Sequence, residues 1–194
     1  ILGAGVQSAL QLKALLLVRE VKSAVIWARD IAKAKAMATR LSDELGIDVT
    51  ANPDIAGAVK AADIVVTTTP SSEPLIMADW LQPGQLIIAM GSDQEHKSEL
   101  APACLSRATL YVPDSQAQCA VKGELRAAIE AGVIPADRRF PELGDITAGK
   151  APGRRSDADI IIADLTGTGV QDTAIATLAR QRAQAAGKGA TFSS

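Results

Sequence analysis

Aromatic residues and cysteines are scarce in this sequence. Aromatic residues make up 3% of the 194 residues, whereas hydrophobic residues as a whole make up 47%. Alanine, valine, isoleucine and leucine must therefore fill the core, as in folds where helices cover a parallel sheet. The two cysteines, Cys104 and Cys119, form no Cys-x-x-Cys pair. We predict that both are reduced thiols of a cytoplasmic protein, with no metal site and no redox pair.

Long hydrophobic runs and clusters of basic residues are also missing. No apolar run approaches the roughly 20 residues that a membrane-spanning helix needs, so we expect no membrane partner. Lys and Arg are scattered along the chain and the formal net charge is −2. Without a basic patch, nucleic acid is not an expected partner either. The length is sufficient for one α/β domain with a sizeable core.

Strand and helix patterns alternate along most of the chain, which predicts an α/β fold with a doubly wound parallel sheet of the Rossmann type. Apolar runs predict strands at residues 24–27, 48–51, 62–67, 86–90, 109–112 and 160–163. Helices are predicted at residues 7–18, 31–45, 55–61, 115–131 and 171–185, with Gly46 and Gly132 placed to end two of them. Residues 140–157 are expected to be a long loop, and the tail after the last helix is expected to be frayed.

The first eight residues fit the turn of a dinucleotide-binding βαβ unit: Ile1-Leu2-Gly3-Ala4-Gly5-Val6-Gln7-Ser8. Gly3 would form the sharp turn, Gly5 would let the backbone approach a pyrophosphate, and Ser8 would let the helix pack close to the sheet. The phosphates would meet the N–H groups of the helix N-terminus, at Val6 and Gln7. The alternative is a glycine turn without a ligand.

Little sequence precedes this turn. Ile1 and Leu2 come before Gly3, whereas a strand normally has about five residues. We therefore expect the natural chain to begin upstream of Ile1.

Further blocks follow the opening turn. They read Ala62-Asp63-Ile64-Val65-Val66-Thr67-Thr68-Thr69-Pro70, then Gly91-Ser92-Asp93 with Lys97 and Glu99-Leu100, then Glu142-Leu143-Gly144 and Pro152-Gly153-Arg154-Arg155-Ser156-Asp157. Together with the turn, their order and spacing resemble the ornithine cyclodeaminase/mu-crystallin family from the first residue to about Leu178. The blocks at residues 91–97 and 165–172 are most similar to the ectoine-utilization branch of that family.

The resemblance implies an NAD(P)-dependent enzyme that acts at the α-carbon of a small amino or diamino acid, forming an imine and releasing ammonia. It also implies an N-terminal domain, absent from these residues, that binds the substrate carboxylate and forms a homodimer. Residues 1–165 would then be the NAD(P)-binding domain. Residues 166–194 would be a C-terminal helix and tail that return to the absent domain.

Asp93 is the candidate for the catalytic acid/base. It follows the strand predicted at residues 86–90, at the end of the sheet where open α/β folds bind ligands. The resemblance assigns proton transfer to this residue, a role that a carboxyl group can fill. The alternative is a turn residue or a helix N-cap, because Asp is favoured at both positions.

Lys97 lies four residues further on and would return to the same face if a helical turn began at Asp93. The resemblance places Lys97 beside the cofactor, and the alternative is an exposed ion pair. His96 is expected to be solvated, as are Arg154 and Arg155, although two arginines could also hold an anion.

The remaining cofactor contacts are expected at the ends of three strands. They are Thr67, Thr68 and Thr69, Gly91 and Ser92, and Thr166 and Gly167. An ordinary strand end and a tight Gly-Thr-Gly turn are the alternatives.

The choice of cofactor depends on the end of the strand at residues 24–27. NAD enzymes usually place an acidic residue there for the ribose 2′-OH, and NADP enzymes supply an Arg instead. Here Ala28 takes the place of the acid and Arg29 follows, so NADP is favoured over NAD. Asp30 could cap the next helix or act as the ribose acid shifted by two residues.

Three functions remain open from the sequence. The first is a cyclodeaminase-like enzyme with Asp93 as its acid/base. The second is a ketimine reductase or an amino-acid dehydrogenase without cyclisation. The third is a non-catalytic NADPH-binding protein similar to the mu-crystallins.

Overall fold

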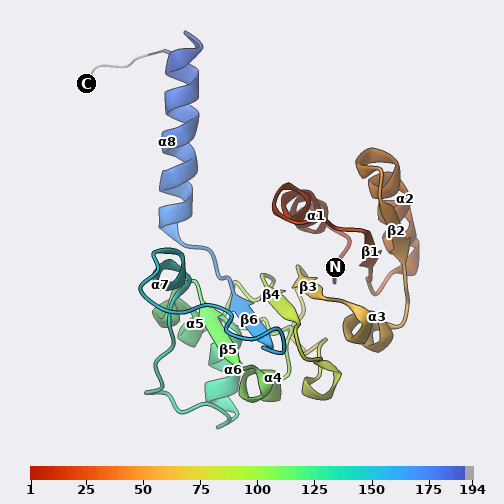
Figure 1. Ribbon diagram of the computed structural model, residues 1–194, viewed down its shortest axis with the longest axis vertical. Helices are drawn as coiled ribbons and strands as arrows, with labels where there is room; N and C mark the ends of the chain where they lie inside the picture. Colours follow the sequence, from red (N-terminus) through yellow and green to blue (C-terminus); the bar gives the residue numbers. More distant parts are fainter. Residues whose placement is uncertain (191–194) are drawn as a thin grey trace.

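A computed structural model describes residues 1–190 (Figure 1). The strands are β1 (Ser23–Ile26), β2 (Asp48–Ala51), β3 (Ile64–Thr67), β4 (Leu86–Ala89), β5 (Leu110–Pro113) and β6 (Ile161–Asp164). The helices are α1 (Val6–Val18), α2 (Ile31–Leu45), α3 (Ile55–Ala61), the 3₁₀ turn η1 (Ala78–Trp80), α4 (Ala103–Arg107), α5 (Gln116–Lys122), α6 (Glu124–Glu130), α7 (Leu143–Thr147) and α8 (Gly169–Ala185). The tail predicted to be frayed includes residues 191–194, which lie outside the described residues.

The strands are parallel and pair in two groups, β2-β1 and β3-β4-β6-β5. Leu2 connects the groups because it bridges Trp27 on one side and Thr67 on the other. Its N–H donates to Val66 O at 2.7 Å and its carbonyl accepts from Thr68 N at 2.9 Å. Strands β1 and β2 therefore lie on one side of Leu2, and β3, β4, β6 and β5 lie on the other side. This order creates a topological switch point between Leu2 and β3, where α/β sheets bind their ligands.

Helices cover both faces of the sheet. On one face α1 and α2 enclose a cluster that includes Leu12, Ile26 and Leu41. On the other face α3, η1, α4 and α6 cover a larger cluster that includes Ile76 and Ile87. These are aliphatic side chains, as the low aromatic content predicts. The fold class predicted from the sequence, α/β with a doubly wound parallel sheet of the Rossmann type, is confirmed.

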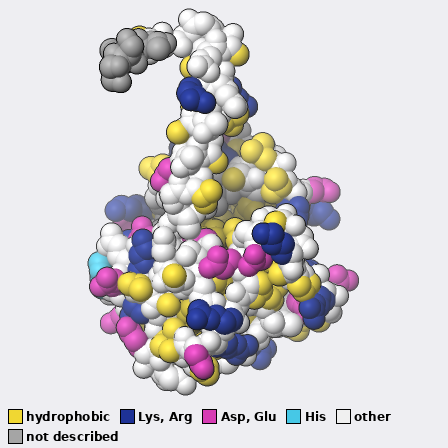
Figure 2. All heavy atoms as spheres, turned by 90° about the vertical axis from the view of Figure 1, so that its left-hand side faces the viewer, with side chains coloured by type: hydrophobic (Ala, Val, Ile, Leu, Met, Phe, Trp, Pro, Cys, Tyr) yellow, Lys and Arg dark blue, Asp and Glu magenta, His cyan; other side chains and the backbone are white. Residues whose placement is uncertain are grey.

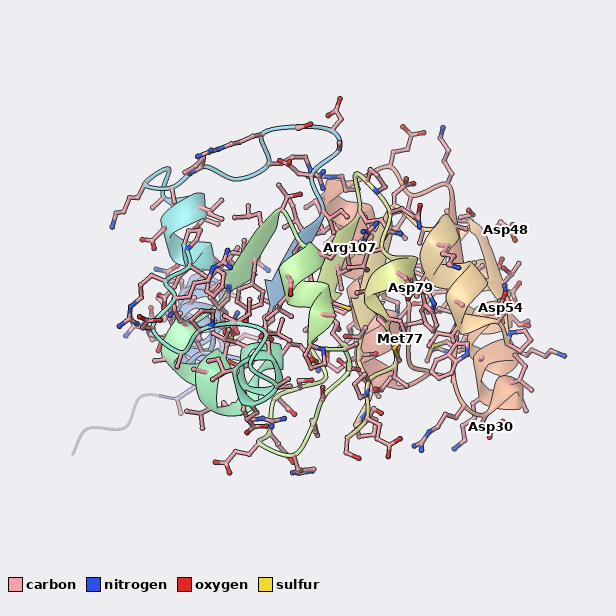
Figure 3. All side chains as sticks on the ribbon, turned by 90° about the horizontal axis from the view of Figure 1, so that it is seen from below. Asp30, Asp48, Asp54, Met77, Asp79 and Arg107 are labelled. Atoms are coloured by element: carbon pink, nitrogen blue, oxygen red, sulfur yellow. The ribbon has the colours of Figure 1, made fainter. Side chains whose placement is uncertain are left out.

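The turn η1 and helix α4, which were not predicted, pack together on the second face. Met77 and Asp79, at the start of η1, and Arg107 of α4 lie on this side of the molecule (Figure 3). The guanidinium of Arg107 donates to Leu81 O through Nη2 at 3.1 Å, which connects the two elements.

Local signals set several helix boundaries as predicted. The α2 helix begins after Asp30, whose Oδ1 accepts from Ala32 N at 3.0 Å, and it ends at Gly46, which has a φ of 68°. The α3 helix begins after Asp54, whose Oδ1 accepts from Gly57 N at 3.0 Å. Figure 3 labels Asp30 and Asp54, the two residues that precede these helices. Asp at the N-cap and Gly at the C-terminus are the residues that helices favour there.

The prediction of one helix over residues 115–131 is wrong. The segment forms α5 and α6, which meet at Gly123, a residue with extended backbone at φ −98° and ψ −170°. Asp164 explains the break, because its Oδ2 accepts from Glu124 N at 2.8 Å and from Leu125 N at 3.3 Å. A Cβ at position 123 would lie 2.6 Å from that same oxygen. A carboxylate 40 residues away thus starts a new helix.

The prediction of a loop over residues 140–157 is also wrong in part, because α7 lies within it. Asp145 accepts from Glu142 N at 3.3 Å, and Ile146 N donates to Glu142 O at 3.3 Å. These local contacts start the helix within a segment rich in Gly and Pro.

The α8 helix stands away from the sheet (Figure 1). Its residues are not buried, and hydrophobic side chains lie along it in Figure 2. Val170, Ile175 and Leu178 of this helix are exposed. No helix within residues 1–190 is long and apolar enough to cross a membrane. In the same residues no group of three His, Cys, Asp or Glu side chains could hold a metal ion. Cys104 and Cys119 are buried and form no disulfide.

Candidate functional site

The opening turn lies at the switch point of the sheet. Gly3 has a φ of 123°, a conformation that glycine adopts without steric cost. A Cβ at this position would lie 2.6 Å from Thr68 Oγ1. Gly3 N also donates to Trp27 O at 2.8 Å. The turn is therefore held between β1 and β3 and leads directly into α1.

The N-terminus of α1 is open. Gly5 is the N-cap residue, and a Cβ built on it would meet no atom within 4 Å. Gly5 has no side chain to cap the helix, and the one capping side chain, Ser8, accepts from the N–H of Gly5 itself. Within residues 1–190 the N–H groups of Val6 and Gln7 have no hydrogen-bond partner. Free amides and the positive end of the helix dipole together favour a bound anion.

Ser8 fixes the helix against β3. Its side chain is buried, its Oγ accepts from Gly5 N at 3.2 Å, and it lies 2.8 Å from Thr68 Oγ1. Thr68 Oγ1 in turn donates to Leu2 O at 3.2 Å. A hydroxyl at the third position of the glycine pattern thus connects the turn, the helix and the strand.

A cavity of about 390 Å³ lies at the carboxyl ends of β3, β4 and β6. One group of its lining residues comes from α1 and from the segments after β3 and β4, namely Gln7, Thr68, Thr69, Gly91, Asp93 and Lys97. The segment after β6 contributes Thr166 and Gly167. The fold therefore brings half of the residues predicted for the site, eight of sixteen, to one cavity.

Asp93 and Lys97 form an ion pair on the wall of this cavity. Lys97 Nζ donates to Asp93 Oδ1 at 2.6 Å. The segment is a turn, closed by Lys97 N donating to Gln94 O at 3.0 Å, and not the start of a helix. Asp93 is exposed while the Lys97 side chain is mostly covered. A carboxylate thus lies beside a cation whose side chain is mostly covered.

The opposite wall is held by two residues that the sequence did not reveal. Asp114 accepts from Thr166 Oγ1 at 3.0 Å and from Gly167 N at 2.8 Å. Gln118 Nε2 donates to Thr166 Oγ1 at 3.1 Å and to Gly167 O at 2.8 Å. Asp114 follows β5 directly, so its position after a strand was the one available signal.

Thr67 and Ser92 do not line the cavity. Both are buried, and their hydroxyls donate to carboxylates behind the cavity walls. Thr67 Oγ1 donates to Glu99 Oε2 at 2.5 Å, and Ser92 Oγ donates to Glu124. The two glutamates were not predicted as site residues, although Glu99 belongs to a block that carries the family resemblance.

Three buried carboxylates lie behind the cavity. Burial, together with the nearby Asp164, raises the pKa of Glu124 to about 7, against the lowering effect of its hydrogen bonds. Burial also raises the pKa of Asp164 to about 6, against the opposing effect of the bond from Tyr111. The pKa of Glu99 is raised by burial, while its hydroxyl and backbone donors lower it. These groups titrate at higher pH than ordinary carboxyl groups.

The corner after β1 lies outside the cavity. Ala28 is half-buried and Arg29 is exposed. The carboxylate of Asp30 accepts from the backbone of Ala32 and Lys33, so it serves as the N-cap of α2. Of the two roles predicted for Asp30, the structure shows the cap.

The remaining candidates lie on the surface. His96 is exposed, as are Arg154 and Arg155. Arg154 Nη1 donates to Asp159 O at 2.7 Å, and Asp159 accepts from the Arg155 N–H at 2.7 Å. The two arginines thus belong to a local turn.

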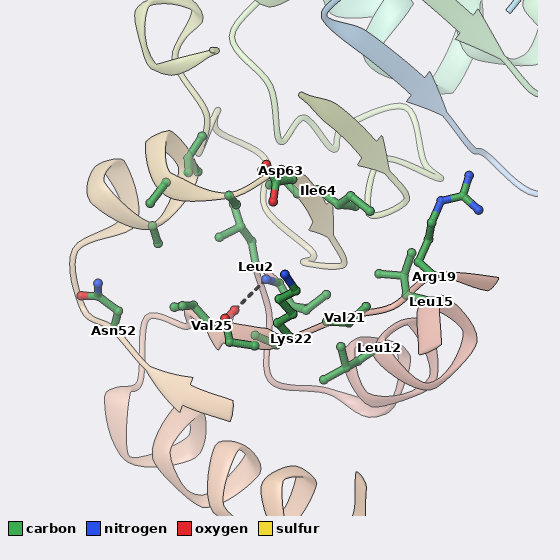
Figure 4. A pocket seen from close by; sticks show the side chains of 18 of the residues that line it. Leu2, Leu12, Leu15, Arg19, Val21, Lys22, Val25, Asn52, Asp63 and Ile64 are labelled. Atoms are coloured by element: carbon green, nitrogen blue, oxygen red, sulfur yellow. Dashed lines mark hydrogen bonds between the residues drawn. The ribbon is translucent and has the colours of Figure 1, made fainter. Parts of the chain in front are cut away.

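A second and larger cavity, of about 480 Å³, lies at the opposite edge of the sheet (Figure 4). Its walls are the amino ends of β1 and β3, with side chains such as Leu15, Val21 and Ile64. The ammonium group of Ile1 donates to Val25 O at 2.7 Å beside it. Open α/β sheets bind ligands at the carboxyl ends of their strands. The smaller cavity is therefore the candidate site.

Comparisons with known proteins agree with this fold. The model of the ornithine cyclodeaminase/mu-crystallin family matches residues 1–187. An uncharacterized cyclodeaminase of Sinorhizobium fredii is 55% identical over 194 residues, which are 100% of this chain and 59% of that protein. The chain thus spans about three fifths of the length of this relative.

Solved structures show the same similarity. An archaeal alanine dehydrogenase dimer with bound NAD superposes with a TM-score of 0.91 at 32% identity, over 99% of this chain and 59% of the other. The Δ1-pyrroline-2-carboxylate reductase of Thermococcus litoralis, in complex with NADH and L-proline, has a TM-score of 0.91 at 28% identity, over 98% of this chain and 59% of the other.

Proposed function

Because the chain belongs to the ornithine cyclodeaminase/mu-crystallin family, we propose that it is the nucleotide-binding part of an NAD(P)-dependent enzyme acting at the α-carbon of an amino or diamino acid. One observation carries this proposal. The glycine turn at the switch point leads into a helix whose N-cap residue, Gly5, has no side chain, and Gln7 of that helix lines the same cavity as Asp93. Residues 1–165 are the proposed nucleotide-binding domain and residues 166–194 its C-terminal extension.

The residues present fit a dinucleotide. The space over Gly5 has room for a pyrophosphate, and the amides of Val6 and Gln7 supply donors without side-chain competition. The adenosine half would lie toward Arg29, after β1. The nicotinamide half would lie in the cavity between Gly91 and Thr166.

The chemistry divides between cofactor and protein. A bound nicotinamide supplies the hydride acceptor or donor for the substrate α-carbon. The protein orients the reactants and transfers protons, and Asp93 is the carboxylate on the cavity wall that can accept a proton from a substrate amine. Lys97 fixes the position of Asp93 through their 2.6 Å contact. Thr166 and Gly167, held by Asp114, form the wall opposite.

NADP is the proposed cofactor. Asp30 already accepts two backbone hydrogen bonds as the cap of α2, and Ala28 offers no acid for a ribose 2′-OH. Arg29 is exposed beside them and can bind a 2′-phosphate. The solved relatives carry NAD or NADH, so NAD is the alternative. Titration with both nucleotides distinguishes the two cofactors.

Imine reduction without cyclisation is the second candidate function. The named activity of the Thermococcus relative, a pyrroline-2-carboxylate reductase, supports it. The blocks at residues 91–97 and 165–172 support the first candidate and a place in ectoine utilization. In both cases the proposed substrate is a small amino or imino acid, and the proposed assembly is a homodimer, as in the alanine dehydrogenase structure.

Calorimetric titration of the chain with NADPH and NADH tests the proposal. We expect saturable binding of one nucleotide per chain, with NADPH bound more tightly. Gly144→Ala, at an exposed site in α7 with open space around it, is the control and should bind normally. Absence of binding to either nucleotide would overturn the proposal. Turnover with amino and cyclic imino acids in the full-length natural protein then separates cyclodeaminase from reductase.

A further inference from the structure

Glu99 is a fully buried carboxylate with no cationic partner in the described residues. Its Oε1 accepts from Thr69 N and from Thr69 Oγ1, both at 2.6 Å. Its Oε2 accepts from Thr67 Oγ1 at 2.5 Å and from Gly91 N at 2.7 Å. Burying a carboxylate is costly unless hydrogen bonds replace its water shell. Four donors from the protein meet that requirement here.

These donors come from two neighbouring strand ends. Thr67 is the last residue of β3 and Thr69 follows it, while Gly91 follows β4. Thr69 and Gly91 both line the candidate cavity. One side chain behind the cavity therefore makes hydrogen bonds to two of its walls.

The contact at Gly91 is tight. A Cβ at this position would lie 2.3 Å from the Glu99 carboxyl group and 2.3 Å from Thr69 O. Only glycine allows the backbone to approach the carboxylate this closely. The backbone after β4 is thus in direct contact with the Glu99 carboxylate.

Glu124 holds the segment that leads to Glu99. It accepts from Glu99 N at 2.8 Å and Leu100 N at 3.1 Å, and from the hydroxyl of Ser92. Both ends of the segment 92–100 therefore meet at one carboxylate. Asp93 and Lys97 lie between these two ends, and their position relative to the cavity depends on this anchor.

We propose that Glu99 is a positioning residue of the nucleotide site, which sets the spacing between the Thr69 and Gly91 walls and, with Glu124, fixes the segment that presents Asp93. The inference rests on the proposed function, because it needs a cavity that binds nucleotide. A carboxylate is required, since an amide would turn two of its own N–H groups toward N–H and O–H donors. The effect is transmitted through the walls, and Glu99 itself does not line the cavity.

Glu99→Gln tests the role, with nucleotide affinity measured by calorimetry well below the melting temperature. We expect the affinity for NADPH to fall roughly tenfold or more, because a misplaced wall weakens every contact made from it. Gln85→Met is the matched control. Gln85 is buried and its Nε2 donates to Val59 O at 2.7 Å and Ala62 O at 2.8 Å, at the amino edge of the sheet. This control should lower the melting temperature and leave the affinity unchanged.

The outcomes separate the two proposals. If the unmodified chain binds neither nucleotide, the proposed function and this inference both fail. If the unmodified chain binds and Glu99→Gln binds equally well, or if Gln85→Met loses as much affinity, the positioning role alone is overturned. If Glu99→Gln does not fold, Thr67→Val decides, because it removes one of the four donors and keeps the side-chain volume. We then expect a smaller loss of affinity, and an unchanged affinity would reject the role.

Discussion

Lys97 Nζ lies 2.6 Å from Oδ1 of Asp93, across a four-residue turn on the wall of the candidate cavity. The pair is not part of a helix, since the turn is closed by Lys97 N donating to Gln94 O. Its geometry depends on the ends of the segment, which Glu124 holds. The Asp93 carboxylate and the Lys97 cation are therefore held together by their own contact and a local turn, while hydrogen bonds to Glu124 anchor the two ends of the segment.

Gly5→Val should abolish nucleotide binding and leave the domain folded. The space over Gly5 is open, and its backbone is extended, so valine causes no strain in the free protein. The added side chain would occupy the place of the pyrophosphate. Circular dichroism should show an unchanged fold, and calorimetry should show no binding of NADPH or NADH.

Gly3→Ala provides the contrast at the same turn. The φ of 123° and the 2.6 Å approach to Thr68 Oγ1 predict a loss of folding stability in addition to a loss of binding. If the Gly5→Val protein binds cofactor normally, the opening turn has only a structural role.

Arg29→Ala should weaken NADPH binding and leave NADH binding nearly unchanged. Loss of one charge-assisted hydrogen bond to a 2′-phosphate corresponds to about 1.5–3 kcal/mol of binding free energy. Titration of both nucleotides against both proteins measures this difference. Arg40→Ala is the control, because Arg40 is an exposed arginine of α2 that pairs with Glu44.

Equal NADPH affinity in the Arg29→Ala and unmodified proteins would remove Arg29 from the site. A preference of the unmodified protein for NADH would reverse the choice of cofactor. In that case Asp30→Asn, which keeps a helix cap, should weaken NADH binding.

Folding stability should fall as the pH rises from about 4.5 to 7. Burial raises the pKa of Glu124 from 4.5 to about 7 in the folded protein. Between these values the folded state binds more protons than the unfolded state, so a rise in pH favours unfolding. The shift corresponds to up to about 3 kcal/mol. Asp164 and Glu99, whose pKa values are also raised, act in the same direction.

Urea denaturation of Glu124→Gln at pH 5 and pH 7.5 checks this expectation. The variant should lose part of the pH dependence, because one of the three buried groups no longer titrates. Glu130→Gln, an exposed carboxylate paired with Arg126, should keep the full dependence. If the unfolding free energy of Glu124→Gln changes between pH 5 and pH 7.5 as much as that of the unmodified chain, Glu124 does not titrate in this range.

Local signals in the sequence predicted much of the fold. The α2 helix has the predicted bounds because Asp30 caps its start and Gly46 ends it. The glycine turn was found because its residues are adjacent in the chain. The break at Gly123 was not found, since it depends on Asp164, which lies 40 residues after Glu124.

The same limit explains what was missed at the site. Glu99 receives its donors from Thr67 and Thr69, about 30 residues earlier, and Asp114 binds Thr166 and Gly167, about 50 residues later. The sequence alone does not distinguish a buried carboxylate from an exposed one, because burial depends on partners that lie far away in the chain. Thr67 was assigned to the cofactor for this reason, although its hydroxyl faces Glu99.

Asp93→Asn should lower turnover of the full-length natural protein by roughly 10²–10⁴-fold, because asparagine keeps the size of the side chain but accepts no proton. Nucleotide affinity should change little, since the loss lies in proton transfer and not in binding. Steady-state kinetics and calorimetry measure the two quantities separately. Asp93→Asn also removes the ion pair with Lys97. The single variant Lys97→Met therefore shows how much of the loss of turnover comes from that contact.

Asp54→Asn is the matched control for this change. Asp54 is an exposed aspartate that caps α3 outside the cavity, and asparagine caps a helix as well as aspartate does. It should therefore keep both turnover and stability. Near-normal turnover of Asp93→Asn would end the acid/base assignment, because a turn residue tolerates the same exchange. A joint loss of stability and nucleotide binding would make Asp93 a structural residue. Loss of turnover alone is the result that the exposed position of Asp93 on the cavity wall predicts.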